Sequence, residues 1–225
     1  MPDQSQSILS STATAIADTP EISRWCLSNS KRIFDLVCTS LILILALPIM
    51  GIVALLIKIS SSGPVLFRQV RTGKDGTLFE LFKFRTMTAR STPGAAITRG
   101  GDSRVSSAGK ILRRLKLDEL PQLFNVLRGE MSLVGPRPDL PQFCVMLPGQ
   151  YCTILHLRPG ITGWASIHFR NEEGLLAAVP EDQLIDHYVN TLLEEKARLD
   201  LEYARRATCL SDTQLLLQTI LSICK

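Results

Sequence analysis

Two adjacent carboxylates, Asp118 and Glu119, stand in the most chemically informative stretch of this sequence. The stretch covers residues 110–138 and reads KILRRLKLDELPQLFNVLRGEMSLVGPRP. Four basic residues come just before the pair, namely Lys110, Arg113, Arg114 and Lys116. A carboxylate near several cations stays ionised at neutral pH, and in that form it can attack phosphorus or bind a divalent metal ion. The pattern therefore indicates chemistry on a phosphorylated substrate.

Two arginines in proline-containing loops follow the carboxylate pair. Prolines fix φ on both sides of Arg137 in the sequence GPRP, and Arg158 precedes a rigid turn in RPGITGW. A guanidinium with little remaining freedom binds two phosphate oxygens at a small entropic cost. The same residues would also occur in ordinary turns whose arginines lie at the surface by chance. The residues by themselves leave both interpretations open.

Two helices are expected on either side of the carboxylate pair. Each is marked by apolar residues at helical spacing, which are Ile111, Leu112 and Leu115 in the first and Leu120, Leu123, Phe124 and Leu127 in the second. Gly129 supplies a C-terminal stop for the second helix. This arrangement predicts Asp118 at the N-cap of that helix, a position where an Asp is common for capping alone.

A β-hairpin is expected ahead of these helices. Residues 65–87 read VLFRQVRTGKDGTLFELFKFRTM, with Gly-containing turn signals at residues 72–76. Lys83 and Arg85 are two positions apart, so strand alternation places both side chains on one face. That face is either a cationic wall of a phosphate site or a solvated strand face.

An uncharged apolar segment of 22 residues runs from Leu36 to Ile57. At about 1.5 Å per residue it is long enough to cross the hydrocarbon core of a membrane. Pro48 lies near its middle, while Lys31 and Arg32 on one side and Lys58 on the other place positive charge at both ends. Positive residues prefer the cytoplasmic side, which favours a broken helix that enters and leaves the same leaflet. A single-span anchor kinked at the proline is the alternative.

The composition sets limits on the remaining regions. Residues 1–30 are rich in Ser, Thr and Ala without apolar periodicity, so a disordered tail is expected there. Residues 65–117 carry 12 Lys and Arg against 3 Asp and Glu, a charge that suits nucleic acid, phosphorylated small molecules or anionic lipid. The six cysteines contain no CxxC pair and no zinc-ligand spacing.

These motifs resemble those of the small monotopic phosphoglycosyl transferases, also called bacterial sugar transferases or undecaprenyl-phosphate sugar-phosphate transferases. The resemblance covers residues 31–164 and rests on KRIFD, GPVLFRQVRTG, FKFRTM, LKLDELPQLFNVLRGEMSLVGPRP and LRPGITGWA. It implies an α+β, mainly helical fold with a small β-hairpin or sheet and amphipathic interfacial helices. It also implies a re-entrant membrane helix over residues 31–59, broken at Pro48, and a catalytic domain over residues 60–225 on the cytoplasmic face of the bacterial inner membrane.

The same resemblance implies a ping-pong transfer of a sugar 1-phosphate from a UDP-sugar to polyprenyl (undecaprenyl) phosphate, with release of UMP. Asp118 would carry the phospho-sugar, and Glu119 would bind Mg²⁺ and help to activate the acceptor. The implied phosphate-binding residues are Lys83, Arg85, Arg113, Arg137, Arg158 and Arg170. The implied membrane anchor comprises Lys31, Arg32, Pro48 and Lys58. The product would begin the synthesis of an exopolysaccharide, a lipopolysaccharide or another glycoconjugate.

One segment departs from the family pattern, and other functions compete. Many relatives follow GITGWA with QVNGRN, whereas this chain has SIHFRN, so His168 and Phe169 are expected to reshape the donor pocket and leave the sugar open. A membrane-anchored scaffold that recognises anionic lipid would use the same charges without chemistry. A nucleic-acid partner is not expected, because the sequence has no recognised nucleic-acid-binding motif. The membrane lipid is an expected partner, and a homo-oligomer remains open.

Overall fold

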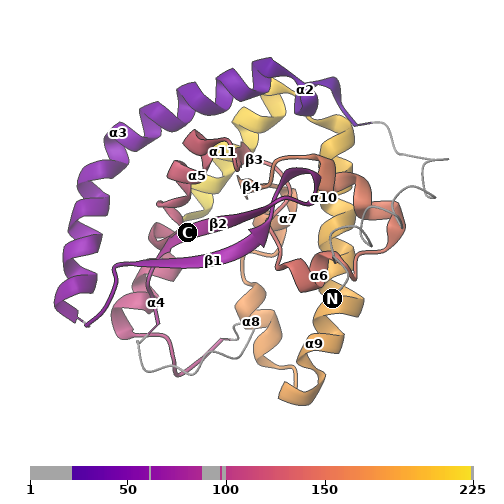
Figure 1. Ribbon diagram of the computed structural model, residues 1–225. Coiled ribbons are helices and arrows are strands. Elements are labelled where there is room, and N and C mark those ends of the chain that lie inside the picture. Colours follow the sequence, from indigo (N-terminus) through magenta and orange to yellow (C-terminus); the bar gives the residue numbers. More distant parts are fainter. Residues whose placement is uncertain (1–21, 61, 88–96, 98–99, 224–225) are drawn as a thin grey trace, which may run out of the picture.

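The computed structural model describes residues 22–60, 62–87, 97 and 100–223 of this protein. Two small sheets lie inside a set of helices, and one long helix follows the outside of the molecule (Figure 1). The predicted α+β, mainly helical fold is confirmed.

The helices are α2 (Arg24–Leu27), α3 (Asn29–Ser60), α4 (Ser107–Arg114), α5 (Gln122–Arg128), α6 (Pro141–Cys144), α7 (Trp164–His168), α8 (Glu172–Ala177), α9 (Leu184–His187), α10 (Glu194–Arg206) and α11 (Cys209–Ile223). Short 3-10 turns are η2 (Lys74–Gly76), η3 (Leu117–Glu119), η4 (Gly149–His156) and η5 (Glu181–Gln183), and η6 (Tyr188–Leu193) is a π-helical turn. The strands are β1 (Leu66–Thr72), β2 (Leu78–Phe84), β3 (Ser132–Val134) and β4 (Gly160–Thr162).

The predicted hairpin is confirmed. Strands β1 and β2 pair antiparallel, from Leu66 opposite Phe84 to Thr72 opposite Leu78. Asp75 in the connecting turn has a φ of 54°, a left-handed conformation that Asp tolerates better than most residues. The hairpin fixes Lys83 one residue before the end of β2, which determines where its side chain enters the site.

A second, parallel sheet joins the two arginine loops. Ser132 in β3 is opposite Gly160 in β4, and Val134 is opposite Thr162. A Cβ atom at Gly160 would overlap the backbone of Gly135, so the two loops are in direct backbone contact. The sheet thereby holds the GPRP loop and the RPGITGW loop, which lie some twenty residues apart in the sequence, against each other.

Helix α3 is one continuous helix through Pro48 and follows a curved path along the outside of the molecule (Figure 1). The predicted break at this proline is therefore wrong as a separation into two helices. A curved helix can absorb the missing donor and the ring of a proline without ending. A re-entrant path through a membrane stays a prediction.

The outer face of α3 is apolar and exposed, while its inner face packs on the core. Ala46, Met50, Val53 and Ile57 are buried. Exposed side chains on the other face include Leu41, Ile44, Leu45, Ile52, Leu55 and Ile59. The helix is 32 residues long and apolar enough to cross a membrane. A soluble surface rarely exposes so large an apolar area, which indicates that this face meets lipid.

Residues 22–30 are folded, so the predicted disordered tail over residues 1–30 is wrong for this part; residues 1–21 lie outside the described chain. The backbone N–H of Ser23 donates to the carbonyl of Ala204 at 2.8 Å, and Trp25 Nε1 donates to Asp212 Oδ2 at 2.8 Å. These partners lie in or beside α10 and α11, far along the sequence. The polar composition of residues 1–30 did not predict these long-range contacts.

A buried ion pair joins the start of α3 to α11. Lys31 Nζ lies 2.5 Å from Asp212 Oδ2, and Tyr203 donates its hydroxyl to Asp212 Oδ1 at 2.8 Å. Asp212 is fully buried and Lys31 is 7% exposed. The Lys31 ammonium is therefore used inside the protein, and its predicted role as a membrane anchor stays a prediction.

Two neighbours of Lys31 connect α3 to the elements beneath the carboxylate pair. Asp35 accepts hydrogen bonds from Ser132 Oγ at 2.8 Å and from the backbone N–H of Leu133 at 3.1 Å. Arg32 donates to the carbonyls of Val126 and Leu127 at 2.8 and 3.2 Å, at the C-terminal end of α5. A cation at this end of a helix satisfies carbonyls that have no partner within the helix.

We predict that Asp212→Asn lowers stability more than Lys31→Met. The first change leaves a buried ammonium without a counter-ion, which costs about 3–5 kcal/mol in comparable pairs. The second leaves the Asp212 carboxylate with two donors, Trp25 Nε1 and the Tyr203 hydroxyl. Thermal unfolding of the detergent-solubilised protein measures both, and the double variant should recover part of the loss. Equal melting temperatures for all variants would contradict the prediction.

Candidate active site

Three segments distant in sequence meet at the Glu119 carboxylate. Lys83 Nζ from β2 lies 2.9 Å from Glu119 Oε1, and Arg137 Nη2 from the loop after β3 lies 3.2 Å from the same oxygen. Glu119 itself lies in η3, between α4 and α5, where Lys116 reverses the chain with a φ of 54°. The structure thus brings together four residues that the sequence had singled out, the fourth being Asp118 beside Glu119.

The two cations keep Glu119 ionised. Burial alone raises the pKa of this carboxyl, but the charges of Lys83 and Arg137 outweigh burial and hold the pKa well below its usual range. In return, the carboxylate of Glu119 raises the pKa of Arg137. The three groups therefore form a cluster of ion pairs around the Glu119 carboxylate.

Asp118 has the opposite environment. Its side chain is buried, and Oδ1 has no hydrogen-bond partner among the described residues. Burial raises the pKa of Asp118, the neighbouring Glu119 raises it further, and the charges of Lys83, Lys116 and Arg113 offset part of the rise. The sequence-based expectation that Asp118 stays ionised at neutral pH remains a prediction, and burial and the adjacent carboxylate work against it.

The predicted N-cap role of Asp118 is wrong. Helix α5 begins after Pro121, and no side chain caps its N-terminus. The chain first forms the η3 turn, so the helix starts four residues after Asp118. The predicted stop is confirmed, because Gly129 has a φ of 84° and donates its N–H to the carbonyl of Val126 at 3.0 Å.

The remaining predicted phosphate ligands lie in different places. Arg113 Nε donates to Thr86 Oγ1 at 2.9 Å, and its Nη1 lies 2.7 Å from Glu173 Oε1. Arg85 Nη1 donates to the carbonyl of Ser62 at 2.9 Å. Arg158 Nε donates to the carbonyl of Gly129 at 3.0 Å, at the same helix end as Arg32. Arg170 is half-buried and makes no side-chain hydrogen bond or ion pair with a described residue. Their phosphate-binding roles stay predictions.

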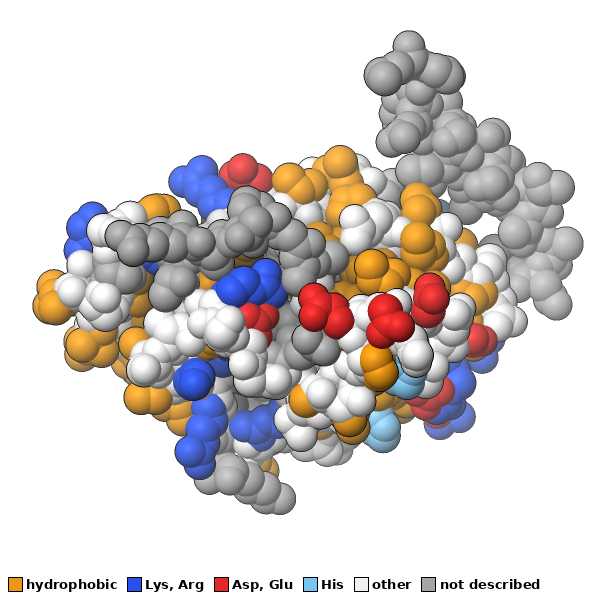
Figure 2. Space-filling view, turned by 90° about the horizontal axis from the view of Figure 1, so that it is seen from below, with side chains coloured by type: hydrophobic (Ala, Val, Ile, Leu, Met, Phe, Trp, Pro, Cys, Tyr) orange, Lys and Arg blue, Asp and Glu red, His pale blue; other side chains and the backbone are white. Residues whose placement is uncertain are grey.

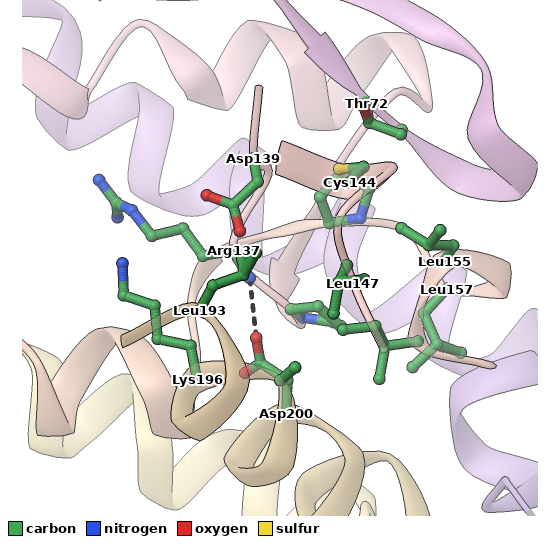
Figure 3. A pocket seen from close by; sticks show the side chains of 15 residues that line it. Thr72, Arg137, Asp139, Cys144, Leu147, Leu155, Leu157, Leu193, Lys196 and Asp200 are labelled. Atoms are coloured by element: carbon green, nitrogen blue, oxygen red, sulfur yellow. Dashed lines mark hydrogen bonds between the residues drawn. The ribbon is translucent and has the colours of Figure 1, made fainter. Parts of the chain in front are cut away.

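Sequence reasoning missed Asp200, which supports the Arg137 loop. The Asp200 Oδ2 atom accepts a hydrogen bond from the backbone N–H of Arg137 at 3.3 Å, drawn as the dashed line in Figure 3. Burial raises the pKa of Asp200 to about 8. A single Asp within the amphipathic LDLEYARRAT segment carried no signal of this contact, because its partner lies 63 residues earlier.

A chain of polar contacts continues along the pocket drawn in Figure 3. Lys196 Nζ lies 2.7 Å from Glu172 Oε1 and donates to the Tyr188 hydroxyl at 3.3 Å, which in turn donates to Asp139 Oδ1 at 3.1 Å. Figure 3 shows the charged ends of Lys196 and Arg137 on the same side of the pocket. The contacts connect α10 to the segment around Arg137 and restrict how that arginine can move.

A divalent cation is compatible with the carboxylate pair. Within the described ranges no group of three or more His, Cys, Asp or Glu side chains lies together. Mg²⁺ needs no such cluster, since one or two carboxylates commonly hold it together with the phosphates of a substrate. The unpartnered Oδ1 of Asp118 and the ionised Glu119 supply suitable oxygens.

A buried carboxylate pair among cations, next to a long helix with an exposed apolar face, is an arrangement suited to an enzyme that acts on phosphorylated substrates near a membrane. Residues 26–225 match the model of the bacterial sugar transferase family, and the chain belongs to this family. The resemblance noted in the sequence is thereby confirmed.

The chain is 44% identical over 200 residues to the undecaprenyl-phosphate glucose phosphotransferase of Komagataeibacter xylinus, which covers 84% of this chain and 35% of that relative. It is 37% identical over 198 residues to the UDP-glucose:undecaprenyl-phosphate glucose-1-phosphate transferase of Caulobacter vibrioides, with 86% and 69% covered. It is 40% identical over 149 residues to the uncharacterized sugar transferase EpsL of Bacillus subtilis, with 63% and 69% covered. The chain thus spans about a third of the length of the Komagataeibacter relative.

We predict that Asp118→Asn raises the melting temperature while Glu119→Gln lowers it. The raised pKa of Asp118 means that its ionised form costs free energy in the folded protein, and the amide removes this cost. We therefore expect Asp118→Asn to have a higher melting temperature than wild type. Glu119→Gln leaves Lys83 and Arg137 without their counter-ion. A similar decrease in both variants would show that Asp118 is stabilising after all.

We predict that Asp200 makes the folded protein less stable as the pH rises from about 4 to about 8. Its pKa rises from 3.8 to about 8 on folding, so in this window the folded protein binds a proton that the unfolded chain does not. Stability falls with rising pH wherever the folded state holds more protons. The test compares melting temperatures of wild type and Asp200→Asn across this range. The variant should lose the part of the pH dependence that ends near pH 8, and parallel curves would contradict the assignment.

Proposed function

We propose that this protein transfers a sugar 1-phosphate from a UDP-sugar to polyprenyl phosphate, with Asp118 as the covalent carrier. The observation that carries the proposal is the unpartnered Oδ1 of Asp118 next to a carboxylate, Glu119, whose own charge is already neutralised by Lys83 and Arg137. An attacking group must be free of strong partners, and the groups around it must tolerate a negatively charged substrate.

In the first half-reaction, the Asp118 carboxylate attacks the β-phosphorus of the UDP-sugar. A bond forms between a carboxylate oxygen and phosphorus, the bond from phosphorus to the bridging oxygen breaks, and UMP leaves with that oxygen. In the second half-reaction, a phosphate oxygen of polyprenyl phosphate attacks the same phosphorus. The bond to Asp118 breaks, which restores the carboxylate and yields polyprenyl diphosphate-sugar.

The charges around Asp118 suit both steps. The raised pKa of Asp118 makes its carboxylate more basic than an ordinary aspartate, and a more basic oxygen is the better nucleophile. Arg113 and Lys83 act on the same carboxyl and are placed to offset the negative charge of a diphosphate. Mg²⁺ held by Glu119 together with the phosphates of the donor would supply further neutralisation of the phosphate oxygens.

The acceptor is a lipid, so the site has to lie near the membrane surface. Helices α4 and α5 flank the carboxylate pair, and they expose Ile111 at 61% and Phe124 at 37%. Helix α3 packs beside α5 and turns its apolar face outward. These surfaces support a catalytic domain that lies against a membrane, with the carboxylate pair near a lipid phosphate. We place it on the cytoplasmic face of the inner membrane, as the resemblance implies.

We predict release of UMP, not UDP, when the detergent-solubilised protein is incubated with Mg²⁺, undecaprenyl phosphate and a UDP-sugar. UDP-glucose is the first donor to test, because the names of the Komagataeibacter and Caulobacter relatives specify glucose. Asp118→Asn should abolish release, since an amide cannot attack phosphorus. Without the acceptor, about one UMP per protein should appear together with a phospho-sugar adduct at Asp118 in mass spectrometry.

Asp75→Asn is the matched control. Asp75 lies in the exposed hairpin turn, where Asn tolerates the left-handed backbone, and its contacts are to Lys74 and His156. This variant should release UMP at the wild-type rate. Release of UDP, or turnover by Asp118→Asn at more than a trace, would contradict the proposed carrier role. If wild type turns over no donor at all, and Asp118→Asn binds anionic vesicles as well as wild type does, the protein is instead a lipid-binding scaffold.

A further inference from the structure

Helix α8 begins with two adjacent glutamates whose side chains hold different cations. Glu172 Oε1 lies 2.7 Å from Lys196 Nζ, and the Lys196 side chain is only 5% exposed. Glu173 Oε1 lies 2.7 Å from Arg113 Nη1, and the Glu173 side chain is 48% exposed. The first contact is internal and fixed, whereas the second lies at the surface.

Arg113 pairs with Glu173 and lies close enough to Asp118 for its charge to act on that carboxyl. Its Nε is held by Thr86 Oγ1 at 2.9 Å, and Nη1 is taken by the Glu173 carboxylate. The positive charge of Arg113 also acts on Asp118. A phosphate placed for attack by Asp118 would therefore reach the same guanidinium that Glu173 now occupies.

We propose that Glu173 is a built-in competitor of the donor phosphates, a residue that sets the affinity of the site for nucleotide by occupying Arg113 until substrate binds. The inference rests on the proposed function, because it takes Arg113 as a ligand of the donor. Carboxylates and phosphates both form paired hydrogen bonds with a guanidinium, so the two groups compete for one partner. The Glu173 carboxylate can pair with Arg113 again once the donor phosphates have left the site.

A phosphate can replace the Glu173 carboxylate at Arg113 if the Glu173 side chain alone rotates. The α8 backbone is held in place, because the Glu173 carbonyl accepts a hydrogen bond from the N–H of Gly100 at 2.7 Å and Glu172 is tied to Lys196. The Glu173 carboxylate is half exposed and can turn into solvent. Ion pairs at this exposure are weak, so a phosphate carrying more charge displaces the carboxylate readily. Figure 2 shows acidic and basic side chains next to one another on one face of the molecule.

The expected effect of Glu173→Gln is a donor KM that is lower by about two- to fivefold, the range that corresponds to a weak surface ion pair. UMP should inhibit the variant more strongly by a similar factor. Because binding does not require turnover, the dissociation constant of UMP is also measured directly by titration calorimetry, at low salt and at high salt. The difference between wild type and variant should shrink at high salt, since the competing pair is screened.

Three further variants test whether tighter UMP binding is specific to loss of the Glu173–Arg113 pair. Glu80→Gln removes an exposed glutamate that lies 3.5 Å from Arg68 in the hairpin, and it should leave UMP affinity unchanged. Glu172→Gln should lower the melting temperature, because it leaves buried Lys196 without its carboxylate, and it should not tighten UMP binding. In an Arg113→Gln background, Glu173→Gln should have no effect on affinity, which a double-mutant cycle measures.

Equal UMP affinity for wild type and Glu173→Gln would overturn this inference and leave the proposed function standing, provided that wild type releases UMP from the donor. Tighter binding by Glu173→Gln that persists in the Arg113→Gln background would also overturn it, since the effect would then not pass through Arg113. Absence of nucleotide binding in every variant, together with no UMP release, would overturn the proposed function and this inference with it.

Discussion

The buried carboxylate of Glu119 is the constraint on which the site depends. Removing an ion of this kind from water costs several kcal/mol, and only close counter-charges offset that cost. Here the counter-charges come from Lys83 in β2 and Arg137 in the loop after β3. The hairpin, the η3 turn and the GPRP loop must therefore converge, although they are distant in sequence. The position of the GPRP loop depends in turn on Asp200, which accepts the N–H of Arg137.

The pKa values of the two adjacent carboxyl groups shift in opposite directions, because the close cation contacts are made to Glu119. Glu119 takes both close contacts, and its pKa falls; Asp118 keeps the burial but no partner for Oδ1, and its pKa rises. Neighbouring carboxyl groups whose environments push their pKa values apart commonly have different roles in a reaction. The fixed charge of Glu119 suits holding and orienting, whereas the unpartnered oxygen of Asp118 suits bond formation. Two neighbouring carboxyl groups thus differ in charge and contacts because of their packing.

The sequence predicted the features that depend on neighbouring residues. The hairpin follows from alternation and a glycine-rich turn, and the end of α5 follows from Gly129, whose left-handed φ of 84° few other residues adopt. It did not predict Asp200 or the pairing of Lys31, because the partners lie 63 and 181 residues away. Lys31 beside an apolar segment has the pattern of a headgroup anchor, and only the tertiary fold shows that Asp212 binds it. The upward shift in the pKa of Asp118 could not be predicted for the same reason, since nearby basic residues are visible in a sequence and burial is not.

The start of α3 connects the membrane-facing helix rigidly to the catalytic site. Lys31 pairs with α11, Arg32 binds the carbonyls at the end of α5, and Asp35 binds β3. Helix α5 follows directly on the turn that holds the carboxylate pair, and β3 leads directly to the Arg137 loop. The depth of α3 in a bilayer would therefore fix the height of Asp118 above it without a flexible linker. A lipid phosphate is confined to the headgroup layer, so a site at fixed height can meet it without searching along the membrane normal. The first turns of α3 would thus help to place Asp118, the proposed nucleophile, relative to the membrane.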